Sequence, residues 1–190
     1  MIKRLFDIIL SALGLLFLLP LLVVISVIIM IDTKGPIIYS QERLGRFGKP
    51  FSIYKFRTMV KDAEPDKPLL SYKEDERITC AGRFLRRFHL DELPQLWNIL
   101  VGEMSFVGPR PERKYFVDQI IETAPEYSKL FQVRPGLSSW GMVKYGYASD
   151  IAQMIERMKY DLIYIDKMSF WVDVKIMVYT IKTVLTGKGI

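Results

Sequence analysis

The sequence predicts a mainly helical α+β protein with a long apolar N-terminal helix and one small β-hairpin. The helix is predicted by an uncharged run over residues 8–31, and the hairpin by two β-rich runs within residues 36–59. Apolar side chains at helical spacing over residues 151–166 and 170–186 predict two amphipathic helices. The chain has 190 residues, which suits one folded unit with a substantial core.

The N-terminal apolar run is long enough to cross a bilayer, because about 20 apolar residues suffice. Pro20 interrupts it, and proline inside a helix removes one backbone hydrogen bond and bends the chain. Positive charge flanks the run on both sides, with Lys3 and Arg4 before it and Lys34 after it. The positive-inside rule then gives no orientation. A spanning helix and a re-entrant helix that bends at Pro20 both fit this pattern.

Residues 36–59 change character and predict a hairpin whose turn is supplied by residues 45–48. Alternation along the second strand puts Lys55 and Arg57 on one face. Two cations there would suit a phosphate, although a solvated face is an equal alternative. The polar stretch that follows, residues 60–78, predicts a surface loop to which we assign no chemistry.

Two adjacent carboxylates, Asp91 and Glu92, stand just before Pro94. Because proline is tolerated in the first turn of a helix, the pattern predicts a helix from about Asp91 to Leu100 that begins with both acids. The dipole at a helix start favours their charged form. Such carboxylates serve as a nucleophile, as metal ligands or as a helix cap.

Arginines next to prolines surround this carboxylate pair in the sequence. Arg110 stands between two prolines, Arg134 precedes Pro135, and Arg86 lies shortly before the pair. A guanidinium on a stiff turn is well suited to phosphate, which it binds in a two-pronged fork. The combination favours a site for a polyanion.

The composition excludes several kinds of site. His89 is the only histidine, which removes Ser-His-Asp and Cys-His mechanisms and multi-histidine metal sites. Cys80 is the only cysteine, so no internal disulfide forms, and a reducing compartment is expected. The net charge of +6 indicates an anionic partner, but nothing beyond that charge supports nucleic acid.

Taken together, these motifs resemble the bacterial monotopic phosphoglycosyl transferases, also called the bacterial sugar transferase family. The likeness covers essentially the whole chain, and the size resembles that of small members that consist of the catalytic domain and its membrane helix. Two positions depart from the family pattern: Leu19 stands where a serine often precedes the proline, and Tyr147 stands near an expected arginine. The motifs that carry the likeness lie at residues 3–7, the run broken by Pro20, and residues 54–59, 90–96, 104–111, 133–136, 160–161 and 173–177.

The resemblance implies a reaction in which a UDP-sugar donates its phospho-sugar to polyprenyl (undecaprenyl) phosphate. It also implies Mg²⁺ and a covalent phospho-sugar intermediate on Asp91, with Glu92 as partner in catalysis and metal binding. The products would be polyprenyl-diphosphate-sugar and UMP, in the first membrane step of polysaccharide or glycoconjugate assembly. The residues expected to bind the phosphates are Lys55, Arg57, Arg86, Arg110 and Arg134.

The resemblance further implies two parts and a location. Residues 1–34 would form a re-entrant membrane helix, and residues 35–190 a catalytic domain on the cytoplasmic face of the bacterial inner membrane. Amphipathic helices would lie in the membrane interface around the catalytic helix. The expected partners are the UDP-sugar, polyprenyl phosphate and the lipid bilayer, and a homodimer stays open. A membrane-bound phosphodiester hydrolase and a non-catalytic scaffold that binds anionic lipid are the alternatives.

Overall fold

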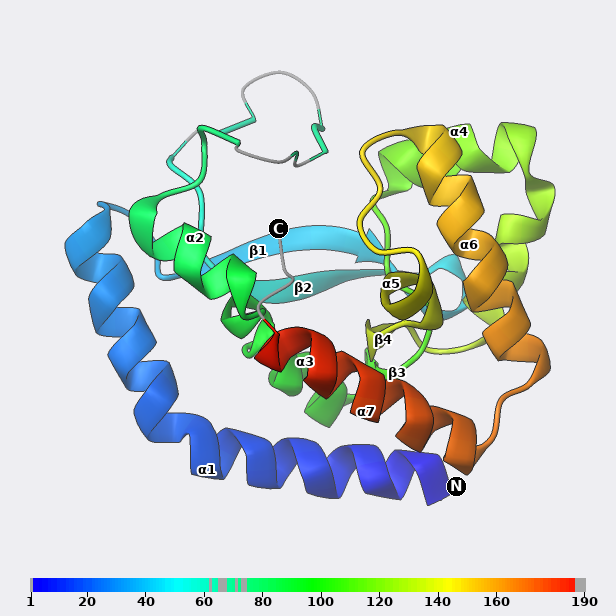
Figure 1. The fold of residues 1–190 in the computed structure, drawn as a ribbon, viewed down its shortest axis with the longest axis horizontal. Helices are drawn as coiled ribbons and strands as arrows, with labels where there is room; N and C mark the ends of the chain where they lie inside the picture. The colour runs from blue at the N-terminus through cyan, green and yellow to red at the C-terminus, as the bar shows by residue number, and fades with distance from the viewer. Residues whose placement is uncertain (1, 62, 65–67, 71, 73–74, 187–190) are drawn as a thin grey trace.

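The computed structural model of the chain describes residues 2–61, 63–64, 68–70, 72 and 75–186. It is a mainly helical α+β fold, as predicted (Figure 1). The α-helices are α1 (Ile2–Asp32), α2 (Cys80–Arg87), α3 (Gln95–Val101), α4 (Lys114–Thr123), α5 (Trp140–Lys144), α6 (Ile151–Asp166) and α7 (Phe170–Leu185). The strands are β1 (Ile38–Leu44), β2 (Pro50–Phe56), β3 (Ser105–Val107) and β4 (Gly136–Ser138), and the 3-10 turns are η1 (Arg46–Gly48), η2 (Leu90–Glu92) and η3 (Pro125–Gln132).

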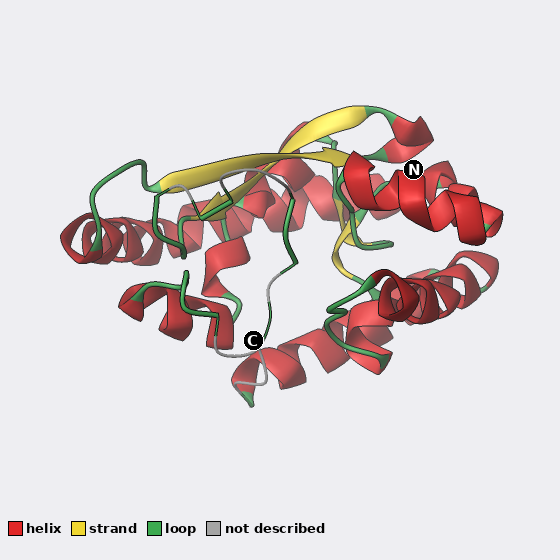
Figure 2. Cartoon of the chain, turned by 90° about the horizontal axis from the view of Figure 1, so that it is seen from above, coloured by secondary structure: helices red, strands yellow, loops and turns green. Residues whose placement is uncertain are grey.

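The predicted hairpin is confirmed. Strands β1 and β2 pair antiparallel along their whole length, from Ile38 opposite Phe56 to Leu44 opposite Pro50. The turn between them needs left-handed backbone at Phe47 (φ 60°) and Gly48 (φ 68°). Figure 2 shows the hairpin as a long ribbon along one side of the molecule, with most helices on its other side.

Helix α1 confirms the long apolar helix, and Figure 1 shows that it is bent near its middle, the part that contains Pro20. Within the described part of the chain it is the one helix long and apolar enough to cross a membrane. Its side chains are mostly exposed, but its inner side packs on α3. Gly14 allows that close approach, because a Cβ there would stand 3.2 Å from a methyl carbon of Leu96.

The N-terminal end of α1 is attached to the folded unit by polar contacts. Lys3 Nζ donates to the carbonyl of Val107 at 2.9 Å and forms an ion pair with Asp173 on α7. Arg4 donates to the last carbonyls of α3 at 2.6 and 2.8 Å. The buried Asp7 carboxylate accepts from the side chain of Ser105 and from the next backbone N–H, both at 3.1 Å.

The other end of α1 is attached to the same unit. Arg57 Nη2 donates to both the carbonyl and the hydroxyl oxygen of Thr33 at 2.7 Å. The carboxylate of Asp32 accepts from the backbone N–H of Ala81, in the first turn of α2, at 3.2 Å. Both ends of the apolar helix therefore contact one folded body.

The two C-terminal amphipathic helices also form as predicted. Asp150 and Ser169 cap α6 and α7, each by accepting a backbone N–H with its side chain. Helix α6 packs with α4 and η3 around the largest apolar cluster of the described residues. Helix α7 buries Ile176, but Trp171 on its outer side is 77% exposed. Other exposed apolar residues on α7 are Phe170, Val178, Ile181 and Leu185.

The prediction that a helix begins at Asp91 is wrong, because the helix begins four residues later, at Gln95. Both carboxylates lie in the separate 3-10 turn η2, and α3 begins at Gln95 with Pro94 as its cap residue. The turn is closed by short-range bonds, from Glu92 N–H to the His89 carbonyl and from Leu93 N–H to the Leu90 carbonyl. The predicted loop at residues 60–78 has no helix or strand in its described part, and its residues 62, 65–67, 71 and 73–74 lie outside that part.

Candidate active site

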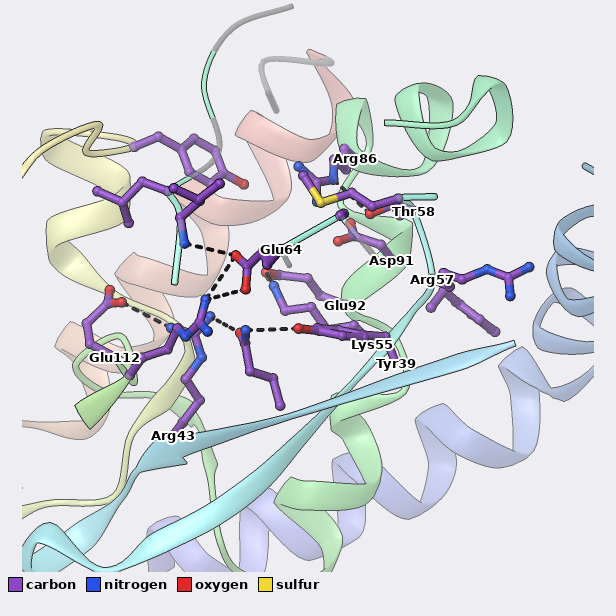
Figure 3. A pocket seen from close by; sticks show the side chains of 18 of the residues that line it. Tyr39, Arg43, Lys55, Arg57, Thr58, Glu64, Arg86, Asp91, Glu92 and Glu112 are labelled. Carbon is purple, nitrogen blue, oxygen red and sulfur yellow. Dashed lines mark hydrogen bonds and ion pairs between the residues drawn. The ribbon is translucent and has the colours of Figure 1, made fainter. Parts of the chain in front are cut away.

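A pocket of about 450 Å³ lies beside the carboxylate pair. Strands β1 and β2 supply one wall, and the loop after β2, the turn η2, the segment after β3 and the helix α6 supply the others. Figure 3 shows the charged side chains around it, with Asp91 and Glu92 between Lys55 and Arg86. The pocket therefore joins segments that are far apart in the sequence.

The turn η2 presents the two acids to this pocket while burying most of their surface. Asp91 is 7% exposed and Glu92 is 8% exposed. The turn begins at His89, whose φ of 53° is left-handed. That conformation is unusual for a residue with a side chain, and such positions are common at functional sites.

Glu92 is held by two cations. Lys55 Nζ lies 2.6 Å from its Oε1, and Arg110 Nη1 lies 3.7 Å from the same oxygen. Burial would raise the pKa of Glu92, but Lys55 and then Arg110 outweigh that effect and lower the pKa to about 2. Glu92 is therefore ionised at any working pH.

Asp91 differs from Glu92 in the direction of its pKa shift. Burial raises the pKa of Asp91 above its usual value, and the charge of Glu92 adds to that effect. Lys55, Arg86 and His89 act in the opposite direction. The two neighbouring acids thus have pKa values moved in opposite directions, which is typical of catalytic pairs.

Arg86 and Arg57 both line the pocket but point in different directions. Arg86 Nε donates to the hydroxyl of Thr58 at 2.8 Å, near Asp91. Figure 3 shows Arg57 directed away from Asp91 and Glu92, in agreement with its bonds to Thr33. In this structure Arg57 holds the end of α1, while Lys55 pairs with Glu92, so the two cations have different partners.

Arg134 does not line the pocket, so the structure does not bring it together with the other residues expected to bind phosphate. Its Nε donates to the carbonyl of Gly102, just past the C-terminal end of α3, at 2.9 Å. Arg4 binds the preceding carbonyls of the same helix. Both arginines therefore satisfy helix-end carbonyls, which attract cations, at the end of α3 opposite the carboxylates.

The loop that carries Arg110 is fixed by the backbone as well as by its prolines. Strands β3 and β4 run parallel, and Gly136 N–H donates to the Pro109 carbonyl at 2.9 Å. A Cβ on Gly108 would collide with the backbone of Arg134, and one on Gly136 would collide with the backbone of Gly108. Only glycine fits at Gly108 and Gly136, where these two segments of the chain cross.

Buried charges support the same loop from the other side. Glu112 pairs with Arg157 at 2.6 Å and with Arg43 at 3.1 Å, and it lies 3.9 Å from Arg110 Nε. Asp161 accepts from the backbone N–H of Gly141 at 2.8 Å and from that of Arg110. Burial raises the pKa of Asp161 to about 6 despite these hydrogen bonds.

Sequence reasoning missed several residues of the pocket. Glu112 lines it, and so do Glu64 and Leu70 from the loop to which we assign no chemistry. Tyr147, which the sequence marks as a departure from the family pattern, lines the pocket as well. Glu64 pairs with Arg113, at 2.8 Å, and so brings that loop across the pocket. The position of Glu112 and Arg113 directly after the Arg110 turn was the one signal in the sequence for this region.

The donor set fits a magnesium ion that is completed by substrate. Among the described residues, no three His, Cys, Asp or Glu side chains cluster as a self-sufficient metal site. Mg²⁺ commonly takes one or two carboxylates and obtains its remaining ligands from substrate phosphates and water. The carboxylates of Asp91 and Glu92, next to a pocket lined with cations, match that pattern.

Comparison with known proteins gives a family match over residues 1–187, to the family described as bacterial sugar transferase. A UDP-N-acetylgalactosamine-undecaprenyl-phosphate N-acetylgalactosaminephosphotransferase of Aeromonas hydrophila is 39% identical over 99% of this chain and 44% of its own length. A UDP-glucose:undecaprenyl-phosphate glucose-1-phosphate transferase of Klebsiella pneumoniae is 40% identical over 94% of this chain and 39% of its own length.

A transferase of Caulobacter vibrioides with the same name as the Klebsiella protein is 37% identical over 97% of this chain and 70% of its own length. The chain thus spans about two fifths of the length of the first two relatives and over two thirds of the third. The named sugars differ among these relatives, while undecaprenyl phosphate is common to all three names.

Proposed function

Because the chain belongs to the bacterial sugar transferase family, we propose that it transfers a sugar 1-phosphate from a UDP-sugar to undecaprenyl phosphate. The observation that carries this proposal is the buried pair Asp91 and Glu92 beside a pocket lined by Lys55, Arg86 and Arg110. A diphosphate needs such cations, and a nucleophile needs a carboxylate that is not otherwise paired.

Asp91 is the nucleophile in this proposal. One of its carboxylate oxygens attacks the β-phosphorus of the UDP-sugar, and the bond from that phosphorus to the bridging oxygen breaks. UMP leaves with the electron pair, and the sugar phosphate remains on Asp91 as an acyl phosphate. A phosphate oxygen of undecaprenyl phosphate then attacks the same phosphorus and restores the free carboxylate. No proton transfer is required in either step.

The division of roles between the acids follows from their partners. Glu92 contacts Lys55 and Arg110 through its Oε1, so it orients these cations toward the phosphates. Asp91 forms no ion pair among the described residues, so its oxygens are available to a substrate. Burial raises its pKa, and Lys55 and Arg86 oppose that rise by stabilising the ionised form. Bound Mg²⁺, held by these two carboxylates and the substrate, would neutralise phosphate charge.

The attachment of both ends of α1 supports a re-entrant helix. If residue 3 lay on the opposite side of the membrane from residue 34, one set of contacts would have to break. The bonds at stake are those of Lys3, Arg4 and Asp7 at one end or those of Thr33 at the other. The bend that Figure 1 shows lets both sets form at once, with the apolar side chains facing lipid.

The exposed apolar side of α7 supports a position in the membrane interface on the cytoplasmic side. Trp171 and Leu185 are each 77% exposed, and Lys3 from the start of α1 binds Asp173 on the same helix. An interface helix accommodates aromatic and aliphatic residues on one side and lysines on the other. The catalytic unit would then face both a cytoplasmic UDP-sugar and a lipid-borne acceptor.

The test is a donor screen with the whole chain in detergent or nanodiscs. Each UDP-sugar is incubated with and without undecaprenyl phosphate, and UMP and lipid-linked sugar are measured. We expect one or a few donors to give stoichiometric UMP and undecaprenyl-diphosphate-sugar, dependent on acceptor and on Mg²⁺.

Two other results would overturn the proposal. Continuous UMP release without acceptor, together with free sugar phosphate, would identify a phosphodiester hydrolase. No UMP from any UDP-sugar, together with binding to anionic vesicles, would identify a scaffold. The matched control is Asp91→Asn, which keeps the shape of the side chain but not its nucleophilic oxygen.

A further inference from the structure

Tyr147 enters the pocket from the segment between α5 and α6. The preceding Gly146 has a φ of 96°, a conformation that favours glycine, and the chain turns there. Tyr147 lines the pocket together with Asp91 and Glu92. Tyr145, only two residues earlier, is 40% exposed and is not a lining residue.

Two neighbours fix the ring of Tyr147. The guanidinium carbon of Arg110 lies 5.8 Å from the ring centroid, within the range of a cation–π contact. The ring of His89 stacks against the Tyr147 ring, with a distance of 6.1 Å between the ring centroids and an interplanar angle of 7°. The ring is therefore held between the arginine loop and the residue that begins the carboxylate turn.

The hydroxyl of Tyr147 has fewer close partners than its ring. Its one hydrogen bond among the described residues is to His89 Nδ1, at 3.4 Å, which is longer than a normal hydrogen bond. Burial raises the pKa of the phenol, the charge of Glu92 raises it further, and Arg110 opposes both. The hydroxyl is therefore close enough to Glu92 and Arg110 for their charges to shift its pKa, and it stays protonated at neutral pH.

We propose that the Tyr147 hydroxyl donates a hydrogen bond to an oxygen of the phosphoryl group as it transfers to and from Asp91. The inference rests on the proposed function and deepens it, since it adds a catalytic residue to that site. In this role Arg110 supplies charge to the phosphoryl group and Tyr147 supplies a neutral donor that does not compete for Glu92. Holding the ring at two places orients the donor before substrate arrives.

The test separates the hydroxyl from the ring. Tyr147→Phe keeps the stack on His89 and the contact with Arg110 and removes only the donor. We expect kcat to fall about 100- to 1,000-fold, as for loss of one preorganised hydrogen-bond donor, with the KM for the UDP-sugar changed by less than about threefold. Tyr145→Phe is the matched control, and its kinetics should equal those of the wild type.

A structural role predicts a different pattern. If the hydroxyl served only to hold the fold, Tyr147→Phe would lower the melting temperature and leave kcat of the folded enzyme unchanged. Wild-type kcat in Tyr147→Phe, or an effect on KM alone, overturns the inference. Tyr147→Leu, which also removes the ring, should lose more activity than Tyr147→Phe if the ring positions Arg110.

Failure of this inference is distinct from failure of the proposed function. If the wild type produces UMP and lipid-linked sugar and Tyr147→Phe does so equally fast, only the role of Tyr147 is wrong. If the wild type produces neither with any UDP-sugar, the proposed function is wrong and the role of Tyr147 falls with it.

Discussion

Replacing Arg110 by lysine keeps the positive charge in the pocket but removes the planar guanidinium. In the wild type, Nη1 lies 3.7 Å from Glu92, Nε lies 3.9 Å from Glu112, and the guanidinium carbon lies 5.8 Å from the centre of the Tyr147 ring. One ammonium cannot satisfy all three neighbours and still grip a phosphate with two parallel bonds. The substitution should therefore weaken phosphate binding without unfolding the protein.

The size of the effect follows from the bond that is lost. A hydrogen bond to a charged group contributes about 1.5–3 kcal/mol. Since about 1.4 kcal/mol corresponds to a factor of ten, kcat/KM of Arg110→Lys should fall about 10- to 100-fold. The assay is initial-rate UMP release at varied UDP-sugar, with melting temperature as the check on folding.

Arg134→Lys is the matched control, because Arg134 also precedes a proline but lies outside the pocket, on the Gly102 carbonyl. Its kcat/KM should stay within about twofold of the wild type, with at most a loss of about 0.5–1.5 kcal/mol in stability. Near-normal kinetics for Arg110→Lys would show that the guanidinium does not bind the phosphates. So would an equal loss of activity in both variants.

Two further predictions concern stability and topology. The pKa of Asp161 is raised to about 6 in the fold from 3.8, so its contribution to stability is full below about pH 4 and is lost as the pH rises through 6, by up to about 3 kcal/mol. Asp161→Asn should therefore flatten the dependence of unfolding midpoint on pH between about 4 and 7, and an unchanged slope would contradict the assignment. Pro20→Leu should straighten α1 and expose a cysteine at residue 3 to an impermeant maleimide in intact cells, in a Cys80→Ser background. The same cysteine in the Pro20 protein should be protected, and ready labelling there would mean that the helix spans.

Elements with strong local patterns were predictable from the sequence. The hairpin follows from β-rich runs on either side of a turn at residues 45–48, and its strands Ile38–Leu44 and Pro50–Phe56 lie within the predicted segment. Helices α6 and α7 begin and end within one residue of the predicted ranges. In each case the spacing of the apolar residues both predicts the type of element and places those residues on the side that is buried.

The conformation and the pKa values of the carboxylate turn could not be predicted from the neighbouring sequence. Pro94 correctly marks a helix start, but the sequence could not tell that Asp91 and Glu92 lie in a preceding 3-10 turn. Their pKa values depend on burial and on Lys55, which is 37 residues from Glu92 in the sequence. Only the packing of η2 against β2 creates that environment.

The different positions of the two arginine turns also depend on tertiary structure. Arg110 and Arg134 look alike in the sequence, yet one lies beside Glu92 and the other at the end of α3. The difference arises because β3 and β4 pair in parallel, so that the two turns meet and their side chains point to different places. Tyr147 likewise reaches the pocket only through the fold of the segment between α5 and α6.

If Asp91 is the nucleophile, it carries the sugar phosphate between the two steps, and the mass of the intact protein shows whether it does. The protein is mixed with the UDP-sugar found in the donor screen and Mg²⁺, without undecaprenyl phosphate, and quenched within seconds. We expect a species heavier than the free protein by one sugar phosphate less water, and digestion should place the added mass on the peptide that contains Asp91. It should disappear on addition of undecaprenyl phosphate and be absent in Asp91→Asn. An Asp91→Asn variant that retains more than about a hundredth of the wild-type rate, or that still forms the adduct, would contradict the claim.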